Sequence, residues 1–217
     1  MVYKRSPLME ERMAVNRERI LLAARKLVAG GGYRNAPVTA VATAAGVSTG
    51  QIYRHFPSKA ELFVEVLNQA VTHEVTLLRA ISSGDGTVAQ RLKQALESFV
   101  RRALAGPGLA YAFIAEPTEP EVEAERIRGR RRFGEVFRDL LAEGVENGEF
   151  PEQDLDASAA CIVGAFTEAL VGPIAPSRNS PRDGERLVES ICGFCLRAVG
   201  AWPEKRRRLR AVPGAAR

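Results

Sequence analysis

Residues 39–63 read TAVATAAGVSTGQIYRHFPSKAELF, and local signals in this stretch predict how the chain folds there. Two helix starts are marked in it. Ser48 stands three residues before Gln51, and Ser58 stands three residues before Glu61. In this capping-box spacing, the serine hydroxyl and the longer side chain each accept a hydrogen bond from a backbone N–H that the first helical turn leaves unpaired. The stretch therefore predicts a helix directly after each serine.

A tight turn precedes the first of these helices. Gly46 stands where the chain must turn between two short helices, and glycine adopts the left-handed conformation of such a turn at little cost. Small apolar side chains flank the turn and can hold the two helices at an angle: Val41, Ala42, Ala45, Val47, Ile52 and Phe56. We predict short helices over residues 38–45 and 49–55, packed as a helix-turn-helix.

The exposed side of the second short helix is polar. It presents hydroxyl, amide, phenol, guanidinium and imidazole groups, from Thr49, Gln51, Tyr53, Arg54 and His55. Such groups reach phosphates and base edges when a recognition helix enters the major groove of DNA. The pattern predicts a DNA-reading helix, and the alternative is an ordinary helical hairpin with a polar face.

Charge is distributed unevenly along the chain. Residues 1–60 carry 10 basic and 3 acidic side chains, residues 61–204 carry 15 basic and 23 acidic, and residues 205–217 carry 6 basic and none acidic. A basic first quarter joined to an acidic remainder is typical of a protein that docks one end on a polyanion. The alternative for the basic part is an ordinary solvated surface.

Residues 45–63, AGVSTGQIYRHFPSKAELF, closely resemble the N-terminal DNA-binding signature of the TetR family of regulators, with Gly32 and Tyr33 at the usual distance upstream. The resemblance implies an all-α fold of about nine helices, with a three-helix helix-turn-helix head at the N-terminus. It further implies a divergent ligand-binding body and a dimer formed by the last two long helices. The implied macromolecular partner is a double-stranded DNA operator.

The resemblance also implies residues that meet DNA: Thr39, Thr49, Gly50, Gln51, Tyr53, His55 and Lys59. Ser48 and Arg54, which lie in the same polar stretch, are expected to meet DNA as well. Thr39 and Lys59 match positions that commonly meet phosphates. The family usually has threonine before its second helix, whereas residues 36–38 here read Ala-Pro-Val, so one cap and one phosphate contact are expected to be missing. Gln51 replaces a frequent threonine, and its amide can pair with adenine at two points.

Glycine and proline interrupt helical periodicity along the chain, and no segment alternates apolar and polar residues for long, so the sequence predicts an all-α fold. Nine helices are expected, over residues 10–29, 38–45, 49–55, 59–81, 88–105, 109–115, 120–147, 156–171 and 181–202. The expected domains are a helix-turn-helix domain over residues 10–60, a ligand-binding and dimerisation domain over residues 61–203, and a basic, disordered tail over residues 204–217.

The last two expected helices predict an interface between two copies of the chain. Residues 158–171 carry one charge, on Glu168, and are apolar or small on every side, so this helix needs cover on both faces. The final helix has a similarly broad apolar band. The helices near residues 156–171 and 181–202 therefore predict a four-helix homodimer interface.

Aromatic and basic residues mark a candidate effector site: Phe99, Tyr111, Phe113, Arg126, Arg130, Phe133 and Phe137. The alternative for each ring is the plain core. At about 100° per residue, Arg126 and Arg130 fall within roughly 60° of Phe137. Either these arginines reach solvent or pair with Glu116 or Glu119, or Arg130 supplies a cation inside an apolar pocket. That pocket would select a small-molecule effector with an apolar body and an acidic group.

Enzyme chemistry is not indicated by the sequence. It contains no phosphate loop or nucleophile elbow, so no catalytic residue, metal or cofactor is expected. Cys192 and Cys195 have CxxC spacing but lie on an apolar stripe, so we interpret them as core residues. The N-terminus lacks the apolar stretch of a signal peptide, and the sequence has no stretch of 18 consecutive apolar residues without a charge. We therefore expect a cytoplasmic protein that does not insert into a membrane.

The expected function is a ligand-responsive transcriptional repressor. It would bind a palindromic operator as a homodimer and would be released by a small-molecule effector. The alternative is a constitutive or architectural DNA-binding protein without an effector, although such a protein does not need a large acidic helical body.

Overall fold

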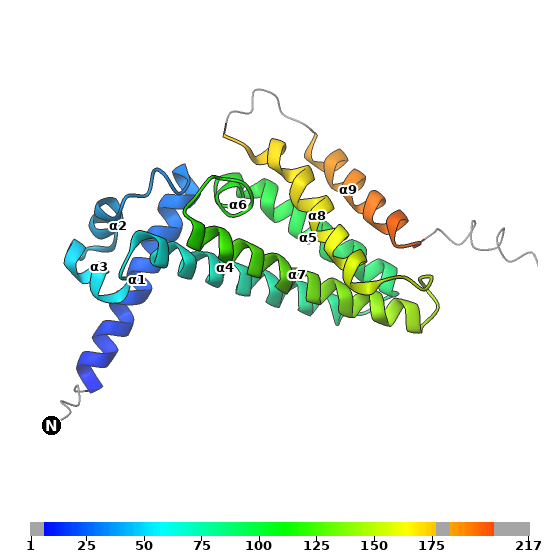
Figure 1. Cartoon of the computed structure of the whole chain (residues 1–217), viewed down its shortest axis with the longest axis horizontal. Coiled ribbons are helices and arrows are strands. Elements are labelled where there is room, and N and C mark those ends of the chain that lie inside the picture. Colours follow the sequence, from blue (N-terminus) through cyan, green and yellow to red (C-terminus); the bar gives the residue numbers. More distant parts are fainter. Residues whose placement is uncertain (1–6, 177–182, 202–217) are drawn as a thin grey trace, which may run out of the picture. The chain divides into compact units, whose positions relative to one another are not determined.

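The computed structural model describes residues 7–176 and 183–201, and every regular element in them is an α-helix (Figure 1). The helices are α1 Pro7–Gly31, α2 Val38–Ala45, α3 Thr49–His55, α4 Lys59–Ser82, α5 Val88–Ala105, α6 Pro107–Ile114, α7 Pro120–Glu146, α8 Leu155–Ile174 and α9 Gly184–Ala198. Over the part of the chain that is described, the all-α prediction is confirmed. The basic tail predicted at residues 204–217 lies outside it.

The chain divides into two compact units. Of the described residues, the first unit contains 7–74, 103–129 and 171–176, and the second contains 75–102, 130–170 and 183–201. Helices α4, α5, α7 and α8 each run from one unit into the other. The units are therefore not consecutive stretches of sequence, and the first combines the helix-turn-helix with α6 and the start of α7.

Glycine and proline set most of the helix boundaries. Helices α2, α3 and α5 have the predicted bounds, and α1 continues through Gly30 until Gly32 takes a left-handed conformation with φ 77°. Helix α6 begins two residues earlier than predicted, at Pro107, because proline is well tolerated in a first helical turn.

The predicted end of α8 at Val171 is wrong. The helix continues through Gly172 and Pro173 to Ile174. Proline lacks an N–H, but here it stands in the last turn of the helix, and Ile174 is buried beside it. Helix α9 begins after Asp183, whose carboxylate accepts hydrogen bonds from the N–H groups of Glu185 and Arg186. Trp202, the predicted end of α9, lies outside the described residues.

Each unit has its own apolar core. In the first unit, Ile20, Ala24 and Val28 of α1 are buried at the predicted i, i+4, i+8 spacing, and α1 packs on α2, α3 and α6. In the second unit, Leu92, Leu96, Phe137 and Phe166 are buried completely. Helix α8 is long and apolar enough to cross a membrane by length and composition, a property that core helices of soluble proteins share.

Candidate nucleic-acid interface

The turn between α2 and α3 is built on Gly46. Its φ of 64° and ψ of 40° place it in the left-handed region, and its N–H donates to the carbonyl oxygens of Ala42 and Thr43. A Cβ at Gly46 would lie 2.8 Å from Nη2 of Arg19 on α1. The predicted left-handed glycine is confirmed, and both its backbone conformation and its close neighbour require the absence of a side chain.

The first turn of α3 is closed by a reciprocal capping box. The N–H of Gln51 donates to Oγ of Ser48 at 3.2 Å, and the N–H of Ser48 donates to Oε1 of Gln51 at 2.8 Å. The Ser48 hydroxyl lies 3.3 Å from the same Oε1. The predicted cap is confirmed. Since the oxygen of Gln51 is engaged in it, two-point pairing with adenine would require the cap to open.

Helix α3 buries one side and exposes the other. Ile52 is 1% exposed, whereas the Tyr53 side chain is 47% exposed and Arg54 is exposed. Ser48 and Gly50 are also exposed, and Thr49, Gln51 and His55 are half-buried. Thr39 is exposed on α2. The polar side chains that sequence reasoning selected on α3 therefore form the outer surface of the helix-turn-helix, with Gly50 leaving room for close approach of another molecule.

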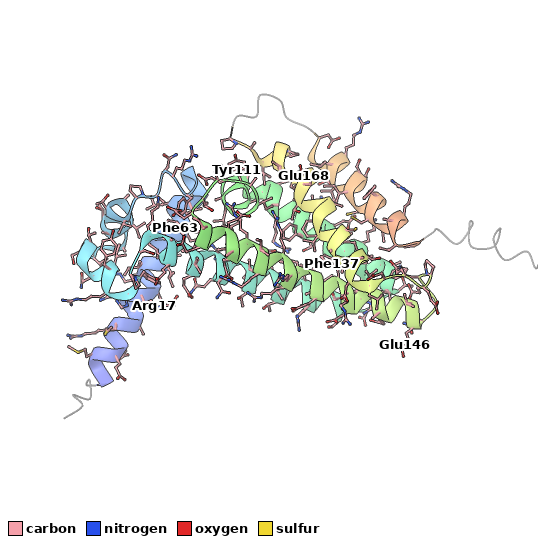
Figure 2. All side chains as sticks on the ribbon, in the orientation of Figure 1. Arg17, Phe63, Tyr111, Phe137, Glu146 and Glu168 are labelled. Atoms are coloured by element: carbon pink, nitrogen blue, oxygen red, sulfur yellow. The ribbon has the colours of Figure 1, made fainter. Side chains whose placement is uncertain are left out.

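Arg17 of α1 lies against this motif (Figure 2). Its guanidinium stands over the Phe56 ring at 5.3 Å and pairs with Glu65 of α4 at 3.2 Å. Burial, and then the positive charge of Arg17, lower the pKa of His55. The imidazole of His55 is thus held in its neutral form at pH 7, when one ring nitrogen donates a hydrogen bond and the other accepts one.

Lys59 points inward rather than away from the protein. Its Nζ donates to the carbonyl oxygen of Tyr33 at 3.0 Å and stands over the Tyr33 ring at 4.1 Å. Sequence reasoning assigned Lys59 to phosphate contact, and the structure gives its ammonium an internal role as well. A partner 26 residues away leaves no local pattern in the sequence.

The start of α2 has no side-chain cap. Pro37 is its N-cap residue and makes no side-chain hydrogen bond to the helix. Its carbonyl oxygen accepts from the N–H of Val41 at 3.1 Å. The predicted loss of the N-cap at residues 36–38 is confirmed.

Several of the residues assigned to an effector site form core contacts in the second unit. The ring centroids of Phe99 and Phe133 are 5.5 Å apart, and the Phe166 ring lies 4.7 Å from Phe99 and 5.8 Å from Phe137. These rings contact one another directly, so a ligand there would have to separate them. In the first unit, Tyr111 and Phe113 are half-buried on α6.

The two arginines assigned to that site differ in exposure. Arg126 is 5% exposed and donates to the carbonyl oxygens of Ala112 at 2.6 Å and Glu116 at 2.5 Å. Arg130 is exposed, which agrees with the alternative that it reaches solvent and does not support a cation inside an apolar pocket. Gly129, one residue earlier, takes the buried position, where a Cβ would lie 3.0 Å from Val71. Arg130 is therefore rotated about 100° away from that contact.

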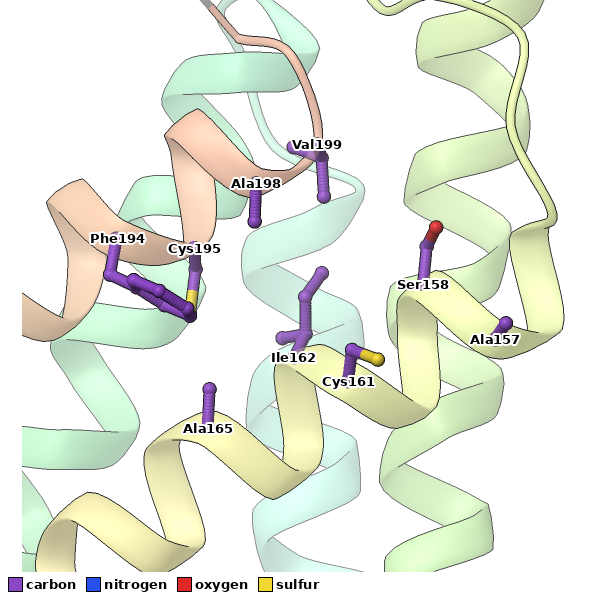
Figure 3. A pocket seen from close by; sticks show the side chains of 9 residues that line it. All are labelled: Ala157, Ser158, Cys161, Ile162, Ala165, Phe194, Cys195, Ala198 and Val199. Atoms are coloured by element: carbon purple, nitrogen blue, oxygen red, sulfur yellow. The ribbon is translucent and has the colours of Figure 1, made fainter.

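Helices α8 and α9 of the second unit border a groove of 330 Å³ (Figure 3). Cys161, Ile162 and Ala165 of α8 line one side, and Phe194 and Cys195 of α9 line the other. Phe194 is 56% exposed although it is aromatic. The groove is almost entirely apolar, so it is a surface that a partner could cover.

The two cysteines of the CxxC spacing are buried core residues, as predicted. Burial raises the pKa of Cys192 to about 12 and that of Cys195 to about 11. Thiols held protonated in this way are poor nucleophiles and poor metal ligands at pH 7. Among the described residues, no group of three or more His, Cys, Asp or Glu side chains is placed to hold a metal ion.

Two family models match the chain. The model for bacterial regulatory proteins of the tetR family matches residues 20–66, and the model for the tetracyclin repressor-like C-terminal domain matches residues 85–170. The first range contains the helix-turn-helix described above, and the second begins just before α5 and ends within α8.

Two relatives and one solved structure are similar to the chain. The HTH-type transcriptional repressor KstR of Rhodococcus jostii strain RHA1 is 47% identical over 184 residues, which are 82% of each chain. The HTH-type transcriptional activator FasR of Mycolicibacterium smegmatis is 34% identical over 112 residues, which are 50% of this chain and 51% of FasR. The transcriptional regulator FadR from Bacillus subtilis, solved in complex with stearoyl-CoA, superimposes with a TM-score of 0.72 at 19% identity, covering 86% of this chain and 99% of FadR.

These proteins are transcription regulators rather than enzymes, and the similarity to KstR extends over both the helix-turn-helix and the helices that follow it. The matched ranges coincide with the capped and polar α3, its glycine turn and the all-α architecture. The chain therefore belongs to the tetR family of bacterial regulatory proteins, whose DNA-binding element here is the helix-turn-helix of α2 and α3.

Proposed function

We propose that the protein is a homodimeric transcriptional repressor that binds a palindromic operator and releases it when a small-molecule effector binds. The observation that carries this proposal is the 47% identity to a repressor over 82% of both chains. The activator FasR matches only half of this chain. Repression is therefore favoured over activation.

In the proposed complex, polar side chains of α2 and α3 in each protomer contact the DNA phosphates and base edges. Tyr53 and Arg54 project from α3, and Thr39 projects from α2. The half-buried Thr49, Gln51 and His55 lie at the edges of this surface, next to Ser48 and Gly50. Guanidinium, phenol and hydroxyl groups suit phosphates, and the amide nitrogen of Gln51 suits an acceptor on a base edge.

The proposed dimer interface is the outer face of α8 together with α9. Ala157, Cys161 and Gly164 of α8 recur on one side of the helix and are exposed. Phe194 of α9 is exposed beside the groove that α8 and α9 border. Small residues let two helices approach closely, and an exposed aromatic ring supplies area to bury, so a second copy of the chain suits this face.

The proposed effector has an apolar body and an acidic group. Support comes from FadR, which has a similar fold and was solved with stearoyl-CoA, a molecule with a long acyl chain and an anionic head. The aromatic cluster of Phe99, Phe133, Phe137 and Phe166 offers apolar surface to such a chain if its rings part. Arg130, which the sequence suggested as the cation for the acidic group, is exposed and does not support this proposal.

The test is release of a selected operator, measured by fluorescence anisotropy. A labelled duplex recovered by selection from random DNA is bound by the full-length protein, and stearoyl-CoA, coenzyme A and a neutral long-chain alcohol are titrated in turn. We expect the acyl thioester to release the duplex and the other two compounds to leave it bound. Release by none of a wider panel of acidic apolar compounds would favour the constitutive alternative.

A further inference from the structure

A carboxylate of the segment after α6 holds the end of α1. Oε2 of Glu116 accepts from the N–H of Tyr33 at 2.7 Å, and Oε1 accepts from the N–H of Arg34 at 3.2 Å. Glu116 is 6% exposed. Hydrogen bonds from two consecutive backbone N–H groups to one buried carboxylate are charge-assisted, so this contact is stronger than an ordinary one.

The backbone before Tyr33 is shaped to admit that carboxylate. Gly32 has a φ of 77°, and a Cβ at this position would lie 2.7 Å from Oε2 of Glu116. Any other residue would be strained in this conformation and would push the carboxylate away. Gly32 and Glu116, which are far apart in sequence, are thus matched to each other.

The segment that carries Glu116 is itself fixed by Arg126. Nη2 of Arg126 donates to the carbonyl oxygens of Ala112 and Glu116, and Nη1 donates to Glu123 at 2.8 Å. The guanidinium therefore lies at the carbonyl end of α6, where the helix dipole favours a positive charge. This buried arginine holds Glu116 in place by its backbone.

Tyr33 continues the connection to the DNA-reading part of the chain. Its carbonyl oxygen accepts from Nζ of Lys59, the first residue of α4, and its ring packs edge-on against Phe63 at 4.6 Å. Lys59 stands four residues after His55, the last residue of α3. Backbone and ring contacts of Tyr33 thus join Glu116 to the helix that follows the recognition helix.

The hydroxyl of Tyr33 plays no part in this connection. Its oxygen is buried without a hydrogen-bond partner among the described residues, and Oε2 of Glu119 is likewise buried and unpaired. Burial, and then the nearby carboxylate of Glu119, raise the pKa of Tyr33 well above its usual range.

We propose that Glu116 is a positioning residue for operator binding. It sets the orientation of the helix-turn-helix relative to α6 and the start of α7, through the N–H groups of Tyr33 and Arg34. The proposal rests on the homodimeric operator binding proposed above. Two heads of a dimer must meet two half-sites at once, so a loosened head lowers affinity for the full operator while each head keeps its own DNA contacts.

The experiment compares two duplexes, a selected operator and the same duplex with one half-site scrambled. Glu116→Gln, Glu116→Ala and Gly32→Ala are measured against one control. Glu121→Ala removes an exposed carboxylate from the first turn of α7, a few residues from Glu116. Fluorescence anisotropy gives the affinities, hydrogen exchange follows residues 32–35, and circular dichroism gives the folded fraction.

We expect the three test variants to bind the full operator about tenfold or more weakly and to bind the half-site duplex like the wild type. Amide exchange over residues 32–35 should accelerate, and the Glu121→Ala control should behave like the wild type. The Gln variant and Gly32→Ala keep the test valid if Glu116→Ala fails to fold. Equal losses on both duplexes, or no loss on either, would overturn the proposal. A wild type without preference for the full operator would refute the homodimeric function and, with it, this inference.

Discussion

Oε1 of Gln51 accepts a hydrogen bond from the N–H of Ser48 at 2.8 Å, and the N–H of Gln51 returns one to Oγ of Ser48 at 3.2 Å. The recognition helix is therefore capped by a residue that also belongs to its polar surface. Only the oxygen of the Gln51 amide is used in the cap, so its nitrogen can donate to an acceptor such as N7 of a purine. Glutamine at this position caps the helix and, in the proposed operator complex, is expected to contact DNA as well.

Replacing Gln51 with glutamate separates these two roles. A carboxylate can still accept from the N–H of Ser48, so we expect the melting temperature of Gln51→Glu to stay near that of the wild type. It cannot donate to a base, so the preferred base at one operator position should change. Gln51→Ala should lose the cap as well and unfold about 1 kcal/mol more easily. Base preferences measured by selection, unchanged in both variants, would show that Gln51 only caps α3.

Two glycines of the helix-turn-helix should respond oppositely to alanine. Gly46 has a φ of 64°, and a Cβ at this position would lie 2.8 Å from a neighbouring atom, so Gly46→Ala should lower the free energy of unfolding by about 1–2 kcal/mol. Gly50 lies within α3 with nothing closer than 4.0 Å, so Gly50→Ala should raise it by about 0.5 kcal/mol. DNA affinity should nevertheless fall for Gly50→Ala. Urea unfolding and operator binding together check both expectations, and a Gly50→Ala protein that binds like the wild type would exclude close DNA approach there.

Variants of Lys59 and Arg54 should differ in how strongly their affinity for DNA depends on salt concentration. Arg54 is exposed on α3, so Arg54→Ala should remove a phosphate contact and reduce the slope of log affinity against log salt by about one. Lys59 donates to Tyr33, so Lys59→Ala should lower stability by about 1 kcal/mol and leave that slope nearly unchanged. A slope reduced by Lys59→Ala as much as by Arg54→Ala would return Lys59 to the phosphate-contact role that the sequence suggested.

The buried cysteines should make stability fall at high pH. Burial raises the pKa of Cys192 from 9.0 to about 12 and that of Cys195 to about 11, so the native state holds these protons more tightly than the unfolded chain does. Their contribution to the free energy of unfolding is therefore complete below pH 9 and is lost as the pH rises through 11 to 12. Urea unfolding between pH 8 and 11 measures this loss, and the Cys192→Ala/Cys195→Ala variant is the control. An identical pH dependence in that variant would assign the loss to other groups.

Local signals predicted most of the secondary structure and the DNA-reading motif. The capping box of Ser48, the left-handed Gly46 and the uncapped Pro37 depend on neighbours within a few residues, and each prediction is confirmed. At Ser58 the hydroxyl accepts from the N–H of Glu61 at 3.1 Å, which confirms that half of the second predicted box. The face of α7 was harder to predict, because Gly129 rather than Arg130 takes the buried position. Helical periodicity is read from the polarity of side chains, so it does not identify a glycine that is buried because a neighbouring side chain packs closely against it.

Contacts across large sequence separations could not be predicted from one sequence. Glu116 and Tyr33 are 83 residues apart, and nothing near either residue marks the other. The inward orientation of the Lys59 side chain could not be predicted for the same reason, because its partner, the carbonyl oxygen of Tyr33, lies 26 residues away in sequence. Sequence reasoning chose Glu116 only as a possible partner of an arginine side chain, whereas its carboxylate binds backbone N–H groups and its carbonyl oxygen binds Arg126.

The most direct measurement of the proposed function is selection of bound duplexes from random DNA, followed by the mass of the complex in sedimentation. We expect an inverted repeat to be enriched, with each complex holding an even number of chains. Gly164→Glu, which puts a charge on the exposed small face of α8, should sediment as a monomer and enrich no inverted repeat. Enrichment of no sequence, or of a single asymmetric site bound by one wild-type chain, would contradict a homodimeric operator-binding repressor.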